Sequence, residues 1–247
     1  MFSDPKAMKS SSLLGLGLLI SAVALVLLAT HPPHALDLAV SQPFYQNGVW
    51  FGKSYLWMEV VGHLWIKWIP ILIALYFLVT LVLAWRAHRL NPRPETRDRL
   101  NRAAFILVGL LITLLAVVIL KRNTGVACPW SSVPFGGEAV IRAPSWPWHK
   151  LPGNCWPSGH AGTGFCLMVM YFAWRDTAPR KAWLWLSFAL AFGAFCSVIR
   201  IMQGAHFLSH CIATLLIDWL ILGVLYYAWR CRWPLGNVST VQSSLNK

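Results

Sequence analysis

Residues 103–120 read AAFILVGLLITLLAVVIL, a run in which Thr113 is the only polar side chain. A helix that crosses a membrane needs about 20 mostly apolar residues, so this run predicts a transmembrane span. Basic residues flank it, with Arg102 before it and Lys121 after it. Similar apolar runs between polar flanks recur on both sides of this segment, and together they decide the fold class.

The composition of the whole chain supports the same conclusion. Of its 247 residues, 57% are hydrophobic and 12% are charged, which is about half the charged fraction of an ordinary soluble domain. We therefore predict an all-α, polytopic membrane protein that forms a single domain over residues 1–247. The first apolar run also resembles the core of a signal peptide, but its length favours a span. Six transmembrane helices are expected, at about 13–30, 64–85, 103–120, 160–174, 182–200 and 206–229.

The distribution of basic residues predicts the orientation in the membrane. With the N-terminus inside, the inner segments contain 14 of the 21 Lys and Arg residues, in line with the excess of positive charge in cytoplasmic loops. Both termini are therefore expected in the cytoplasm, and the long loop 121–159 on the periplasmic face. We attribute the formal net charge of +13 to topology and to anionic head groups. No compact basic motif indicates a nucleic-acid partner.

Four ionisable residues are expected at one membrane face, each at the end of a different span. Lys121 ends the third span, His160 begins the fourth, Arg200 ends the fifth and His206 begins the sixth. Taken one at a time, they are compatible with snorkelling anchors, ordinary helix-end histidines and a loop charge. Their convergence favours a functional site, because ionisable groups at this depth are costly unless they serve one.

Phosphate chemistry suits such a cluster. Lys121 and Arg200 offer charge and donors to phosphate oxygens. Ser158 and the backbone N–H groups at the start of the fourth span add further donors at the positive end of a helix dipole. One histidine can attack phosphorus while the other protonates the leaving oxygen. No metal or other cofactor is expected, because neither paired carboxylates nor a Cys/His metal spacing occurs among these helix ends.

Three segments carry a resemblance to a known family. KRNTGVACP (121–129), PSGH (157–160) and SVIRIMQGAH (197–206) resemble, in order and spacing, the three signature motifs of the type 2 phosphatidic acid phosphatase superfamily of membrane lipid phosphate phosphatases. The resemblance covers about 90 residues directly. It implies a six-helix membrane phosphatase with a cluster of catalytic residues at helix ends on the periplasmic face.

The resemblance also implies a role for each residue of the motifs. Lys121 and Arg200 bind the phosphate, and Ser158 with the Gly159 amide stabilises the developing charge. His160 acts as the general acid on the leaving group. His206 attacks phosphorus and forms a phosphohistidine that water hydrolyses.

Two departures from the motifs concern phosphate binding. Cys128 stands where the family usually has an arginine, so one cation is missing; the candidates to replace it are Arg122, Arg142 and Lys150. In the third motif, Ser197 is separated from Arg200 by two residues, so the usual Ser-Arg adjacency is lost.

The largest departure is His210, which stands where the family has the aspartate that orients the nucleophilic histidine. Four residues along a helix keep His210 on the same face as His206. A neutral imidazole lacks the negative charge that stabilises an imidazolium, so weaker catalysis is expected. Glu59 and Glu138 are candidates for a supporting carboxylate. Asp218 is expected to lie ~18 Å deeper than His206 along the helix.

Two of the six cysteines, Cys128 and Cys155, fall in the predicted outer loop. An oxidising periplasm allows them to pair. We therefore predict a disulfide between them, which would hold the first two motifs together and contribute about 3–4 kcal/mol.

These observations lead to one functional expectation and two rivals. We expect a metal-independent lipid phosphatase of the bacterial inner membrane that acts on undecaprenyl diphosphate or a related lipid phosphate. Lipid A phosphate, phosphatidylglycerophosphate and phosphatidic acid remain open as substrates. The rivals are a phosphotransferase that passes the phosphoryl group to another lipid, such as lipid A, and a binding protein that has lost turnover. The sequence does not predict the oligomeric state.

Overall fold

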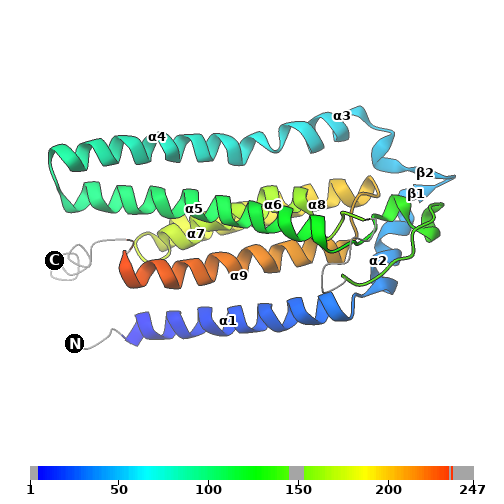
Figure 1. Cartoon of the computed structure of the whole chain (residues 1–247), viewed down its shortest axis with the longest axis horizontal. Helices are drawn as coiled ribbons and strands as arrows, with labels where there is room; N and C mark the ends of the chain where they lie inside the picture. The colour runs from blue at the N-terminus through cyan, green and yellow to red at the C-terminus, as the bar shows by residue number, and fades with distance from the viewer. Residues whose placement is uncertain (1–4, 145–152, 234, 236–247) are drawn as a thin grey trace.

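The computed structural model describes residues 5–144, 153–233 and 235, and it shows a bundle of long helices (Figure 1). The long helices are α1 (Pro5–Thr30), α4 (Trp68–Leu90), α5 (Pro94–Asn123), α8 (Pro179–Met202) and α9 (Leu208–Arg232). Each of the five contains a stretch long and apolar enough to cross a membrane. The all-α membrane architecture predicted from the sequence is therefore confirmed in its main features.

Helix α4 packs along α5, and α1 packs along α9 on the other side of the bundle (Figure 1). Residues 91–93 connect α4 to α5, and Pro94 occupies the first position of α5, where a missing N–H does no harm. The Thr96 hydroxyl accepts a hydrogen bond from the Arg93 N–H, at 3.2 Å, and caps this helix start.

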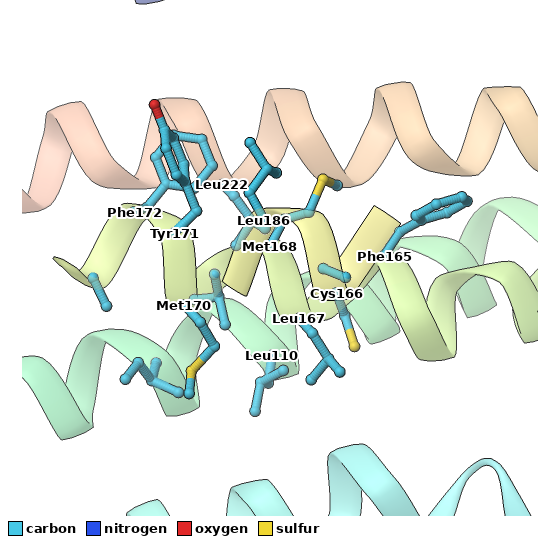
Figure 2. Packing of buried hydrophobic residues seen from close by; sticks show 14 of the residues in the cluster. Leu110, Phe165, Cys166, Leu167, Met168, Met170, Tyr171, Phe172, Leu186 and Leu222 are labelled. Carbon is cyan, nitrogen blue, oxygen red and sulfur yellow. The ribbon is translucent and has the colours of Figure 1, made fainter. Parts of the chain in front are cut away.

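The fourth predicted span, 160–174, is the exception among the six. It consists of α6 (Gly159–Phe165), the 3₁₀ turn η6 (Cys166–Met168) and α7 (Val169–Trp174). This broken helix lies at the centre of the bundle against α5, α8 and α9. Residues 161–173 are all buried, and Figure 2 shows their side chains inserted between neighbouring helices, with Leu110 and Leu222 among their partners.

Glycines allow the backbones of this central helix and α8 to approach closely. A methyl group on Gly164 would lie 2.4 Å from the backbone nitrogen and Cα of Gly193. A methyl group on Gly193 would lie 2.2 Å from the ring of Phe165. Small residues at helix contacts are the usual means by which membrane helices pack tightly.

Several predicted boundaries are corrected by the structure. Helix α5 extends from Pro94 to Asn123, beyond both ends of the predicted span 103–120, and α4 begins and ends later than predicted. Helix α9 begins at Leu208, so His206 lies in the turn before the helix. Gly204, with φ +67°, ends α8 in a left-handed conformation, and the N–H groups of Ala205 and His206 bond back to the Arg200 carbonyl.

We call the end of the bundle where α5 and α8 end and α6 and α9 begin the site end. Short elements cover it: α2 (His34–Ser41), η1 (Gln42–Phe44), the hairpin β1 (Tyr45–Gln46) and β2 (Val49–Trp50), η2 (Phe51–Lys53), α3 (Leu56–Glu59), the π-helix η3 (Val60–Trp65), η4 (Pro129–Ser131) and η5 (Val133–Phe135). Trp50 packs on Phe135, which packs on Phe207. Trp50 also leaves no space for a side chain at Gly204, so this cluster fixes the turn that carries His206.

Candidate active site

Ser158 fixes the start of α6 and joins it to α9. Its side chain caps α6 by accepting the Ala161 N–H at 3.4 Å. Its own N–H donates to the His210 carbonyl at 3.3 Å, and its carbonyl accepts the Thr214 hydroxyl at 3.0 Å. The PSGH segment is thereby held against the first turns of α9.

Among the predicted catalytic residues, His206 has a clearly defined hydrogen bond. Its side chain is almost fully buried, and its Nδ1 lies 2.8 Å from the carbonyl oxygen of Cys155. A carbonyl only accepts, so Nδ1 must carry the proton and Nε2 keeps a free lone pair. This is the tautomer that a nucleophilic histidine needs.

The electrostatic surroundings keep His206 uncharged. Burial lowers the pKa of His206 well below its ordinary value of 6.5, and the neighbouring His210, Lys121 and Arg200 lower it further. The hydrogen bond to Cys155 opposes this shift. Both cations therefore lie close enough to the His206 imidazole to affect its charge.

The two cations are held by different means. Nζ of Lys121 lies 3.9 Å from the position that a Cβ on Gly159 would occupy, which places the ammonium beside the PSGH segment. The buried Arg200 donates from Nη1 to Oε1 of Gln203 at 2.7 Å. The amide of Gln203 donates to Glu59 at 3.3 Å. This chain of contacts fixes the guanidinium with a carboxylate behind it.

His160 and His210 occupy different environments. His160 lies in the first turn of α6 and is partly exposed, as a group that must meet a substrate oxygen would be. His210 is buried, and its ring centroid lies 6.0 Å from that of His206. The two rings are therefore close, although His206 belongs to the turn before α9 and does not share a helix face with His210.

The predicted disulfide between Cys128 and Cys155 is present, with a Cα–Cα distance of 5.2 Å. It joins the loop after α5 to the segment that precedes Ser158. Cys155 thus has two roles in the structure: its sulfur closes the loop and its carbonyl orients His206.

The candidates for the missing cation of the first motif have different environments in the structure. Arg142 lines a small cavity that also contains His210, whereas Arg122 is exposed. Lys150 lies outside the described residues. Of the two predicted supporting carboxylates, Glu59 is joined to Arg200 through Gln203, whereas Glu138 lies exposed on the loop after η5.

Three contributors were missed by the sequence analysis: Gln203, the Cys155 carbonyl and Asp37 of α2. Asp37 is buried and binds Ser209 at the start of α9. A backbone carbonyl leaves no signal in a sequence, and nothing in the sequence links Asp37 to a residue 172 positions away.

Within the described part of the chain, no group of three or more His, Cys, Asp and Glu side chains is arranged to hold a metal ion. The convergent groups are instead cations, a hydroxyl-capped helix start and histidines. These groups suit an anionic substrate that is attacked by an imidazole.

Comparison with known proteins identifies a family for this chain. A family model described as the PAP2 superfamily matches residues 102–234, which is more than half of the chain. The matched region contains Lys121, Ser158, Gly159, His160, Arg200, His206 and His210. No curated protein and no solved structure matches the chain.

Proposed function

Because the chain belongs to the PAP2 superfamily, we propose that it is a lipid phosphatase that works through a phosphohistidine at His206. The observation that carries the proposal is the His206 side chain, whose Nδ1–H is bound by the Cys155 carbonyl at 2.8 Å. Its free Nε2 is available next to two cations that can hold a phosphate.

The proposed first step is attack on phosphorus. Lys121, Arg200 and the N–H groups at the start of α6 hold the phosphoryl oxygens. Nε2 of His206 forms a bond to phosphorus while the bond to the leaving oxygen breaks. His160 donates a proton to that oxygen. The products are a phosphohistidine, a neutral His160 and the leaving group. The leaving group is a lipid alcohol from a lipid phosphate, or a lipid monophosphate from a lipid diphosphate.

The second step regenerates the enzyme. Neutral His160 accepts a proton from water as the water oxygen attacks phosphorus, and the bond between Nε2 and phosphorus breaks. Inorganic phosphate leaves, and both histidines return to their starting protonation states. No step of this proposal requires a metal ion.

The proposed substrate is a lipid phosphate or diphosphate that reaches the site from the outer leaflet of the bacterial inner membrane. The excess of Lys and Arg in the segments on the opposite, predicted cytoplasmic side, 14 of 21 residues, supports a periplasmic site. Undecaprenyl diphosphate is our first choice, because recycling of that carrier presents a phosphoanhydride at this face. The groups of the site recognise phosphate and do not distinguish among lipid chains.

The test is the release of inorganic phosphate from undecaprenyl diphosphate by the purified protein, beside a His206→Ala variant of matched thermal stability. We expect release by the wild type and loss of at least about 10³-fold in the variant. An acid-labile, alkali-stable phosphoprotein formed only by the wild type would identify the intermediate. Transfer of the phosphoryl group to added lipid A, without phosphate release, would replace hydrolysis with the phosphotransferase function.

Lipid binding without release or transfer would contradict the proposal. In that case His206→Ala and the wild type would both bind the lipid phosphate, and neither would form a phosphoprotein. The substitution of His210 for the family's aspartate makes this outcome worth measuring, since weakened stabilisation of the imidazolium is its expected effect.

A further inference from the structure

A small cavity of about 10 Å³ lies between α2 and the start of α9. Its polar lining consists of His34, Asp37, Arg142, Ser209 and His210. A cavity of this size has room for roughly one water molecule, which can join polar atoms on its walls. The buried Nδ1 atoms of His34 and His210 make no hydrogen bond within the described part of the chain.

Asp37 makes the closest polar contacts between α2 and α9. Its side chain is 2% exposed. Oδ1 accepts the backbone N–H of Ser209 at 2.9 Å, and Oδ2 accepts the Ser209 hydroxyl at 2.5 Å. Burial raises the pKa of Asp37 above its ordinary value, while the two Ser209 bonds and the nearby His34 oppose that rise. A carboxylate at a helix N-terminus is also stabilised by the helix dipole.

Asp37 binds the start of α9 close in sequence to the proposed nucleophile, His206. Ser209 directly precedes His210 and follows His206 by three residues. Asp37 therefore brings a carboxyl group to the same helix turn at which the third motif has His210 in place of aspartate.

The other acidic groups near α9 are less well placed. Glu59 is bound to Gln203 behind Arg200. Asp218 is eight residues beyond His210, about 12 Å deeper along the helix.

We propose that Asp37 supplies the negative charge that the third motif lacks, and that it acts as a positioning residue on His206 through the first turn of α9 and His210. This inference rests on the proposed function. When Nε2 of His206 bonds to phosphorus, Nδ1 keeps its proton on the Cys155 carbonyl and the ring becomes cationic. A carbonyl orients that ring without neutralising it, whereas a carboxylate stabilises positive charge. Asp37 lines the same cavity as His210, whose ring centroid lies 6.0 Å from that of His206.

The segment that carries Asp37 lies outside the region matched by the family model, which begins at residue 102. The charge and the orientation that a single aspartate provides in the family's third motif are thus divided in this chain. The Cys155 carbonyl orients the ring, and Asp37 supplies the charge.

The test compares Asp37→Asn with the double variant Asp37→Asn/His210→Asp. An amide still accepts a hydrogen bond from Ser209 but carries no charge. We expect kcat to fall about tenfold in Asp37→Asn, with KM and thermal stability near those of the wild type. The double variant should recover most of the lost kcat, because it restores a carboxylate at the first turn of α9.

Asp218→Asn is the matched control, since it removes another buried carboxyl, one that lies on α9 outside the site. Its kcat should equal that of the wild type. An unchanged kcat in Asp37→Asn would overturn the inference, as would a loss of kcat that His210→Asp does not restore. A wild type no faster than His206→Ala would overturn the proposed function itself, and this inference with it.

Discussion

At the scale of single residues, a main-chain oxygen takes the place of a side chain in orienting His206. The Cys155 carbonyl bonds Nδ1 at 2.8 Å, across 51 residues of sequence. This arrangement tolerates a histidine at position 210, because the tautomer of His206 no longer depends on the residue four positions later. It also accounts for a third motif that departs from its usual form while His206 keeps an oriented ring.

The lowered pKa of His206 predicts how activity depends on pH. A histidine nucleophile works as the neutral imidazole, and burial favours that form down to a pH well below 6.5. We therefore expect kcat/KM on a lipid diphosphate to persist as the pH falls through 6.5. The measurement is a pH profile of kcat/KM, with substrate binding to His206→Ala recorded in parallel to separate the titration of the substrate.

A different profile would contradict this prediction. If kcat/KM fell with an apparent pKa near 6.5 while binding to His206→Ala stayed constant, the nucleophile would have the pKa of an ordinary exposed histidine.

The sequence predicted the motif residues of the site better than their supports. Charged and polar residues at the ends of apolar runs are visible without a structure, and this signal is what predicts Lys121, His160 and Arg200 as site residues. Gln203 and Asp37 gain their roles only through contacts that folding creates. Gln203 bonds Arg200 from the same helix end, and Asp37 bonds Ser209 across most of the chain.

At the scale of elements, the disulfide joins Cys128 of the first motif to Cys155, which lies just before the PSGH motif. Replacing Cys128 with Ser opens a cross-link that spans 27 residues, which removes about 3–4 kcal/mol by loop-closure arguments. We expect a lower unfolding temperature and a lower kcat, because the freed segment no longer fixes the Cys155 carbonyl against His206. Thermal unfolding and phosphate release measure the two effects.

Cys231→Ser is the control for that substitution, since Cys231 is an exposed free cysteine at the far end of α9. It should leave both quantities unchanged. A Cys128→Ser variant with the kcat of the wild type would show that the carbonyl is held in place without the cross-link.

The contact between α6 and α8 is the second element on which the site depends. Gly164→Ala places a methyl group 2.4 Å from the backbone of Gly193, so the helices must separate. Because α6 carries His160 and α8 carries Arg200, we expect kcat to fall by up to about 10²-fold and stability by about 1–3 kcal/mol.

Gly15→Ala provides the comparison for this variant, because nothing lies within 4 Å of a methyl group on Gly15. It should be neutral in both assays. If Gly164→Ala had the same kcat and stability as Gly15→Ala, α6 and α8 would have room to adjust without moving the site.

Element boundaries illustrate where sequence patterns stop being informative. Apolar runs locate helix interiors, but polar residues extend α5 outward to Asn123, because a helix end continues while its backbone bonds are satisfied. The start of α9 was placed two residues early. The turn that delays it depends on Gly204 and on the aromatic cluster around Trp50, which forms only in the folded protein.

At the scale of the whole molecule, α1 begins and α9 ends at the same end of the bundle, opposite the site end (Figure 1). With the predicted orientation, that end faces the cytoplasm. Cys231 is the exposed free cysteine among the described residues and lies there. We expect a membrane-impermeant maleimide to label Cys231 in inverted vesicles but not in intact spheroplasts, with Cys231→Ser as the unlabelled control.

Labelling of Cys231 from outside would reverse the topology and place the site in the cytoplasm. The substrate would then have to come from the inner leaflet, whereas the arrangement of the catalytic groups would be unaffected.

The burial of the central helix determines when the site can form as the chain is synthesised. Residues 161–173 are buried by protein, and the PSGH segment before them bonds to His210 and Thr214 of α9. The ribosome delivers α9 after the other long helices, so the PSGH segment of a nascent chain lacks these partners until α9 has been made. The proposed site can therefore form only after α9 has joined the earlier helices, which makes it one of the last parts of this bundle to assemble.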